Sequence, residues 1–66
     1  MTLKNVLDLI NKYDKVSIHN SVGYVVFDGM ATGLSTPVMK KIISEYLDNT
    51  VDQIRPYNDT FVILLK

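Results

Sequence analysis

The chain has 66 residues, of which 47% are hydrophobic, and its seven basic side chains balance seven acidic ones. It contains no cysteine, which excludes a disulfide-stapled miniprotein and a cysteine-based zinc module. The apolar fraction and the zero net charge also exclude a disordered charged tail. Together these quantities indicate one small globular domain over residues 1–66, whose own core is marginal at this size. We therefore expect either one tightly packed core or apolar surface kept for a second copy or another protein.

The N-terminal residues do not look like an export signal. Residues 1–5 lead into an amphipathic segment, without a positive region followed by a continuous apolar core. The longest uninterrupted apolar run covers only residues 61–65, whereas a membrane-spanning helix needs about 20 apolar residues. We therefore expect a cytoplasmic protein that does not associate with a membrane.

The first half of the chain predicts a helix followed by a β-hairpin. Residues 16–20 and 24–30 follow a strand pattern, and the segment Asn20–Gly23 between them tolerates the positive φ angles of a tight turn. Before them, Thr2 is suited to cap a helix and Asp14 ends its pattern. The apolar stripe of this helix consists of Leu3, Val6, Leu7, Ile10 and Tyr13.

The second helix is predicted to begin at Pro37. Thr36 and Pro37 are typical of an N-cap and a first helical residue, the position where proline is tolerated best. An apolar stripe then runs from Val38 to Leu47, and Ile42 within it is predicted to be buried.

Two further strands follow this helix. Residues 50–56 form the weaker one, and Pro56 belongs at a sheet edge or strand end because proline donates no ladder hydrogen bond. A turn at 57–59 precedes residues 60–65, which carry the strongest strand signal in the chain and are predicted to bury Ile63.

The predicted fold is therefore α+β, with the element order α-β-β-α-β-β. The simplest packing is a four-stranded antiparallel sheet with two helices on one face, which leaves nothing to cover the other face. Residues 24–27 and 61–65 are apolar at consecutive positions, so the open face is expected to bury a homodimer or partner interface. The residues predicted to lie there are Tyr24, Val26, Val62 and Leu64. A register slip of one residue would replace them with Val25, Phe27, Phe61 and Ile63.

Tyrosines are a second sign of binding, because tyrosine is enriched at interface hot spots. Tyr13 and Tyr46 end helical stripes and are expected at the edge of the core. Tyr24 and Tyr57 flank the two hairpin turns and are candidates for the partner surface, with cross-strand packing as the simpler explanation. The candidate partner-binding residues are therefore Tyr24, Val26, Tyr57, Val62 and Leu64.

No pattern in the chain predicts catalysis, a metal or a cofactor. His19 is the only histidine, and Ser17 shares its strand face, but a catalytic histidine also needs an orienting carboxylate. Asp28 and Gly29 indicate a turn or bulge and lack the second acidic residue of a calcium loop. The glycine spacing matches neither a dinucleotide fingerprint nor a phosphate loop. We therefore expect a protein that is not an enzyme.

A nucleic-acid-associated protein that uses Lys40, Lys41 and Arg55 is the alternative. Its weakness is electrostatic, since both halves of the chain are close to neutral and no basic face follows from composition. Nucleic acid is therefore the less favoured partner.

Short motifs occur in a recognisable order along residues 15–65. They are Lys15-Val16-Ser17-Ile18, then Phe27-Asp28-Gly29, a connector at Leu34, and the final strand Asp59-Thr60-Phe61-Val62-Ile63. In this order they resemble a group of small uncharacterised proteins of Gram-positive bacteriophages and mobile elements. This chain departs from that pattern in its longer second helix, Pro37 to Asp48.

The resemblance implies a small accessory protein, without catalytic residues to carry over, that acts in the host cytoplasm. We accordingly expect a non-enzymatic protein that binds a host or defence protein, a second copy of itself, or both. An inhibitor such as an anti-CRISPR is one member of this class.

Overall fold

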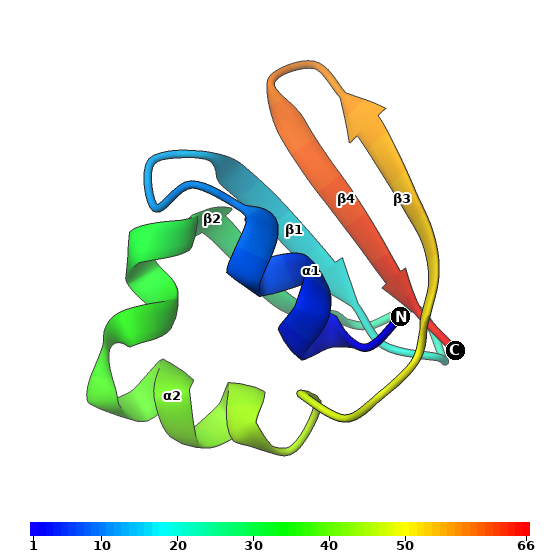
Figure 1. Ribbon diagram of the computed structural model, residues 1–66, viewed down its shortest axis with the longest axis horizontal. Coiled ribbons are helices and arrows are strands. Elements are labelled where there is room, and N and C mark those ends of the chain that lie inside the picture. The colour runs from blue at the N-terminus through cyan, green and yellow to red at the C-terminus, as the bar shows by residue number, and fades with distance from the viewer.

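The computed structural model describes all 66 residues and has the predicted order of elements (Figure 1). The elements are, in chain order, α1 (Leu3–Leu9), β1 (Lys15–His19), β2 (Val25–Met30), the 3₁₀ helix η1 (Ala31–Ser35), α2 (Pro37–Ser44), β3 (Val51–Tyr57) and β4 (Thr60–Leu65). The predicted α+β class is therefore confirmed.

Both helices begin where the sequence predicts, because threonine side chains satisfy amides that have no partner within the helix. At α1 the hydroxyl of Thr2 accepts from the Asn5 amide at 3.3 Å, and the Asn5 side chain accepts from the Thr2 amide at 3.1 Å. At α2 the hydroxyl of Thr36 accepts from the Met39 amide at 3.4 Å, with Pro37 as the first helical residue. The predicted caps at Thr2 and Thr36 are confirmed.

Both helices end earlier than their apolar stripes predict. After Leu9 the chain turns, and the backbone N–H of Asn11 donates to the Asp14 carboxylate at 3.0 Å, while that of Tyr13 donates to the Asn11 side chain at 2.9 Å. Such side-chain contacts compete with the helical hydrogen bonds and favour a turn. α2 likewise ends at Ser44, before the end of its apolar stripe.

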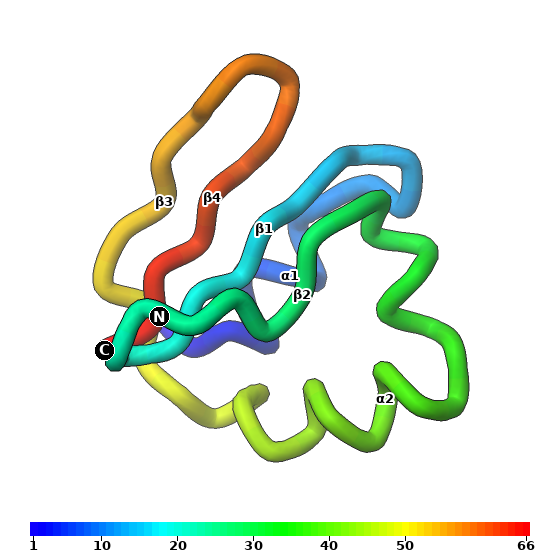
Figure 2. The backbone as a smooth tube through the Cα atoms, turned by 180° about the vertical axis from the view of Figure 1, so that it is seen from behind, coloured from blue at the N-terminus to red at the C-terminus, as the bar shows by residue number.

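The four strands form one mixed sheet in the order β2-β1-β4-β3. The two hairpins, β1–β2 and β3–β4, are antiparallel, but the central strands β1 and β4 run parallel, with Ile18 opposite Ile63. The prediction of a wholly antiparallel sheet is therefore wrong at this central pair, which lies side by side in Figure 2. The two hairpins meet where β1, the first strand of one, pairs with β4, the last strand of the other, and these two strands run in the same direction.

The hairpin turns and the sheet edge use residues suited to them. Gly23 and Asn58 adopt positive φ angles of 89° and 54°, which glycine and asparagine tolerate better than other residues. Pro56 lies on the edge strand β3, as predicted, where one neighbouring ladder is absent and a missing donor is tolerated.

The core lies between the sheet and the helices. Ile63 is fully buried, as predicted, but the prediction for Ile42 is wrong, because Ile42 is 40% exposed and Ile43 is only 5% exposed. Adjacent residues on a helix point about 100° apart, so a small rotation of α2 exchanges their environments. The core cluster consists of Leu3, Val6, Ile18, Ile43, Ile63 and Leu65.

The helices cover the sheet unevenly. In Figure 1 α1 lies in front of the central strands, and α2 lies beside it on the side away from β3, an arrangement that Figure 2 shows from behind. No helix lies in front of β3 (Figure 1). Neither α1 nor α2 has the length and apolar composition needed to cross a membrane.

Candidate partner-binding groove

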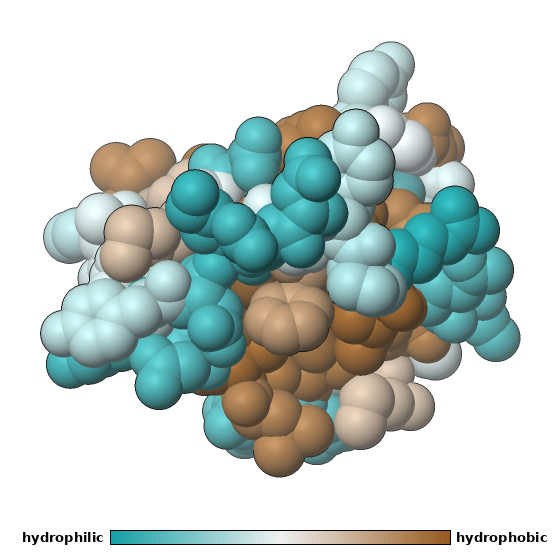
Figure 3. Space-filling view, turned by 90° about the horizontal axis from the view of Figure 1, so that it is seen from above, coloured by the Kyte–Doolittle hydropathy of each residue, from teal (hydrophilic) through white to brown (hydrophobic).

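An open groove of about 260 Å³ lies between α1 and the β3–β4 hairpin, and is called the α1–β3 groove below. Figure 3 shows apolar side chains gathered in one part of the face seen from above, with hydrophilic side chains around them. Six of the seven residues that line the groove are hydrophobic, and the seventh is acidic. The lining residues are Met1, Val6, Leu9, Ile10, Asp14, Ile54 and Phe61.

The sheet side of the groove follows from strand alternation and register. Phe61 is paired with Val16, and Ile54 is paired with Ile63, so both side chains lie on the helix-facing side of the sheet. Val16 and Ile63 are fully buried, whereas Ile54 and Phe61 remain 43% and 40% exposed. The difference arises because the helix layer covers neither the edge strand β3 nor the hairpin end of β4 (Figure 1).

The helix side of the groove is built by the last turn of α1. Val6 faces the core and is only 3% exposed, while Leu9, three residues later, is 78% exposed. Leu9 lies outside the predicted apolar stripe, so it projects beside the groove and does not pack beneath the helix. A large apolar side chain left in this position is a candidate contact for another molecule.

Asp14 has the one charged side chain of the groove. It is half-buried, and one carboxylate oxygen accepts the hydrogen bond from the Asn11 amide at 3.0 Å. The ammonium of nearby Lys12 lies 5.1 Å from the centre of the Tyr13 ring. Because an ionised carboxylate has two oxygens that accept several hydrogen bonds, Asp14 retains capacity for a donor that enters the groove.

The opposite sheet face is more polar than the sequence predicts. Val62 and Leu64 lie on it, as predicted, but both are half-buried and are paired with Ser17 and His19 of β1. Asp28 of β2 is paired with Ser17 from the other side. Polar and apolar side chains therefore alternate across this face, and they form no continuous apolar patch.

Val26 is not on that face. The pairing of β1 with β2 shifts between Ile18 and His19, which face Phe27 and Val25, so Val26 is an extra residue in β2. A bulge of this kind turns the following side chains. Val26 packs against the core cluster, so the expectation that it lies on the open face is wrong.

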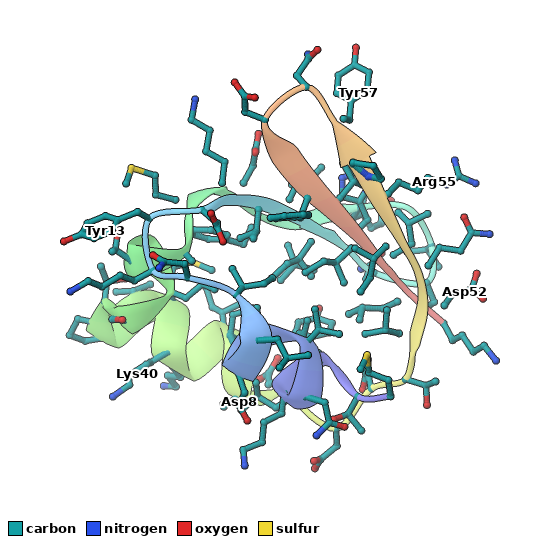
Figure 4. The ribbon with its side chains drawn as sticks, turned by 45° about the horizontal axis from the view of Figure 1, so that its top comes forward. Asp8, Tyr13, Lys40, Asp52, Arg55 and Tyr57 are labelled. Atoms are coloured by element: carbon teal, nitrogen blue, oxygen red, sulfur yellow. The ribbon has the colours of Figure 1, made fainter.

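The two tyrosines predicted to contact a partner lie at opposite ends of the sheet. Tyr24 is 73% exposed and precedes β2, near the ends of β1 and β4 where His19 is paired with Leu64. Tyr57 is 69% exposed and lies at the turn of the β3–β4 hairpin (Figure 4). The five predicted partner-binding residues are therefore not brought together on one surface.

Ser17 and His19 do contact each other. The Ser17 hydroxyl oxygen lies 2.9 Å from Nε2 of His19, and Ser17 is 8% exposed. The pair lies on the sheet face opposite the α1–β3 groove, and this contact is the one hydrogen bond of the imidazole. A nucleophile–base pair also requires a group that orients the imidazole and donors for the developing oxyanion. We interpret the pair as a polar contact between neighbouring side chains on one strand.

The basic residues of the alternative hypothesis are separated. Lys40 and Lys41 lie on α2, whereas Arg55 lies on the edge strand β3. Figure 4 places Lys40 and Arg55 on opposite sides of the molecule. No three histidine, aspartate or glutamate side chains come together as a metal site.

Sequence reasoning did not identify the groove. Leu9 was the available signal, because it is an apolar residue outside the stripe of its helix. Phe61 appeared only in the slipped-register set, and Asp14 was interpreted as the end of a helix. Ile54 lies in the strand with the weaker signal, and its exposure depends on the position of a distant helix.

Comparison of the chain with known protein families, curated proteins and solved structures finds no match.

Proposed function

We propose that this chain is a non-enzymatic protein-binding module and that the α1–β3 groove is its contact surface. The observation that carries the proposal is the exposure of large apolar side chains around one groove: Leu9 is 78% exposed, Ile54 43% and Phe61 40%. Met1, which also lines the groove, is 64% exposed. Large apolar side chains gathered on one surface often mark a binding site.

The dimensions of the groove favour a protein over a small molecule. Pockets for small ligands have volumes of about 300–1,000 Å³ and contain several convergent polar groups. This groove has a volume of about 260 Å³, is open, and contains one polar side chain, Asp14. It fits one or two large apolar side chains of a partner, which is how interface anchors are commonly seated.

We extend this proposal to an accessory role, which the sequence resemblance of residues 15–65 to small phage and mobile-element proteins implies. In that role the module occupies a surface of a host or defence protein and so inhibits it, as an anti-CRISPR does. The separation of Lys40 from Arg55 argues against the nucleic-acid alternative, because phosphate binding requires clustered basic side chains.

Site-specific photocrosslinking tests the proposal. A benzophenone side chain is introduced at Leu9, in the groove, and in a separate protein at Val38, an equally apolar helical residue that is 70% exposed outside it. Both side chains are mainly in solvent, so neither replacement is expected to unfold the protein. Each protein is irradiated in the cells in which it naturally occurs, and the crosslinked products are identified by mass spectrometry.

We expect one defined protein partner to crosslink at position 9 and not at position 38. Excess unlabelled wild-type protein should suppress this product, whereas a Leu9→Gln competitor should not. Equal products from both positions, or none from position 9, would refute the groove as a protein-binding surface.

A further inference from the structure

No helix covers β3 on the helix-facing side of the sheet (Figure 1). Neighbouring strands are about 4.8 Å apart, so β3 lies about 10 Å from β1, two places away in the sheet. Packed helices are separated by 8–10 Å. A helix placed beside α1 at normal packing distance would therefore lie over β3, where Figure 1 shows none.

The exposed fractions of the side chains on this face of the sheet indicate the same uncovered region. Under the existing layer Ile18 and Ile63 are fully buried, and on the same face toward β3 the side chains of Ile54 and Phe61 are about two-fifths exposed. A helix in the gap would bury Ile54 and Phe61 from above and Leu9 from the side. A helix of about 12 residues is about 18 Å long, which matches most of a seven-residue strand.

We infer that the partner inserts a basic amphipathic helix into the α1–β3 groove and so completes the helix layer; this inference rests on the protein-binding function proposed above. The apolar face of that helix, with side chains spaced three and four residues apart, contacts Leu9, Ile54 and Phe61. Its basic residue faces Asp14, because docking removes water from this half-buried carboxylate and a cationic hydrogen-bond donor compensates the loss.

The charge of the groove argues against a second copy as the occupant. A symmetric dimer brings the same patch of both subunits together. Each patch contains Asp14 and no basic side chain among its lining residues, so a second copy supplies no side-chain cation from this patch to pair with either partly desolvated carboxylate. A basic partner supplies that cation.

Titration of the isotope-labelled protein with three synthetic 16-residue peptides tests the inference. The first has a leucine stripe at helical spacing and a lysine-rich polar face. The second has the same stripe with glutamate on the polar face, and the third is a scrambled form of the first. Backbone amide chemical shifts locate each contact and give its dissociation constant.

Two variants with matched controls test the two parts of the groove. Leu9→Gln removes an apolar contact, and Val38→Gln is its control on the other helix. Asp14→Asn removes the acceptor charge, and Asp8→Asn is its control, since Asp8 is exposed on α1 and does not line the groove. Amide spectra of the unbound variants show whether each one is folded.

We expect the lysine peptide to shift amides of α1 and β3 and to bind at least tenfold more tightly than the scrambled peptide. Leu9→Gln should weaken binding about tenfold, and Asp14→Asn about three- to fivefold, with both controls unchanged. Equal binding of the lysine and glutamate peptides, or of the striped and scrambled peptides, would overturn the inference.

Other outcomes separate this inference from the proposed function. A partner that crosslinks at position 9 through an extended or loop segment would overturn the helix and leave protein binding intact. Crosslinks at position 9 that join two copies of this chain, with a concentration-dependent dimer in sedimentation, would make the second copy the occupant and also overturn it.

Discussion

Two adjacent isoleucines on α2 give the most direct test of the core. Ile43 is 5% exposed and belongs to the core cluster, whereas Ile42 is 40% exposed and does not. Replacement by alanine removes the equivalent of three methylene groups in each case. At the buried position this loses about 2.4 kcal/mol of transfer free energy and adds the cost of a cavity. We therefore expect Ile43→Ala to lower the free energy of unfolding by about 3 kcal/mol.

At Ile42 the same replacement is expected to cost about 1 kcal/mol or less. Part of the side chain is already in water, no enclosed cavity forms, and alanine favours the helix by a few tenths of a kcal/mol. Because 1 kcal/mol shifts the Tm of so small a domain by about 4–8 °C, the difference of about 2 kcal/mol should separate the two melting temperatures by about 8–16 °C.

Urea unfolding followed by far-ultraviolet circular dichroism measures both variants, and an unchanged slope shows that the midpoint reports stability. Since the whole domain is expected to be stable by only several kcal/mol, Ile43→Val is included as a milder change that costs about 1 kcal/mol. Equal losses for Ile42→Ala and Ile43→Ala would refute the assigned orientation of α2.

Gly33→Ala should destabilise the fold by about 1–3 kcal/mol, because a Cβ atom at position 33 would lie 3.1 Å from the Phe27 ring. In a double-mutant cycle of unfolding free energies, Phe27→Leu should recover part of that loss, and strictly additive losses would contradict this contact. His19→Ala should leave the yield of crosslinked product at position 9 within about threefold of wild type. If His19 were a catalytic acid or base, its loss would lower the activity of the protein about a hundredfold or more. Fluorescence anisotropy should show no duplex DNA binding with a dissociation constant below about 10⁻⁵ M near physiological salt. The nucleic-acid alternative would instead be supported by sub-micromolar binding that weakens with salt and is lost in the Lys40→Glu, Lys41→Glu double variant.

Local chemistry was sufficient to predict the type and order of the elements. The sequence was sufficient to predict the caps at Thr2 and Thr36, the proline at the start of α2 and the turn at Gly23. Each of these features depends on hydrogen bonds or φ angles within a few residues. The edge position of Pro56 was readable for the same reason, since a missing donor is a property of the residue itself.

The pairing of the strands was not contained in their local patterns. Alternation along β1 or β4 defines two faces of each strand, but it is the same whether the neighbouring strand runs parallel or antiparallel. The bulge that turns Val26 into the core has the same origin, because it depends on how β1 and β2 meet. The apolar side chains at consecutive positions of β2 therefore suggested an open apolar face that the folded sheet does not have.

The α1–β3 groove exists only at the tertiary level. The sequence predicted that two helices would cover one face of a four-stranded sheet. Which strand stayed uncovered depended on the strand order, on the early ends of both helices and on the positions of α1 and α2. Helices of seven and eight residues are too short to span the whole face, so an edge hairpin retains exposed apolar side chains. Ile54 has the same residue type as its buried partner Ile63, and Phe61 is apolar like its buried partner Val16. Only the position of a helix distant in the sequence makes Ile54 and Phe61 part of a candidate binding surface.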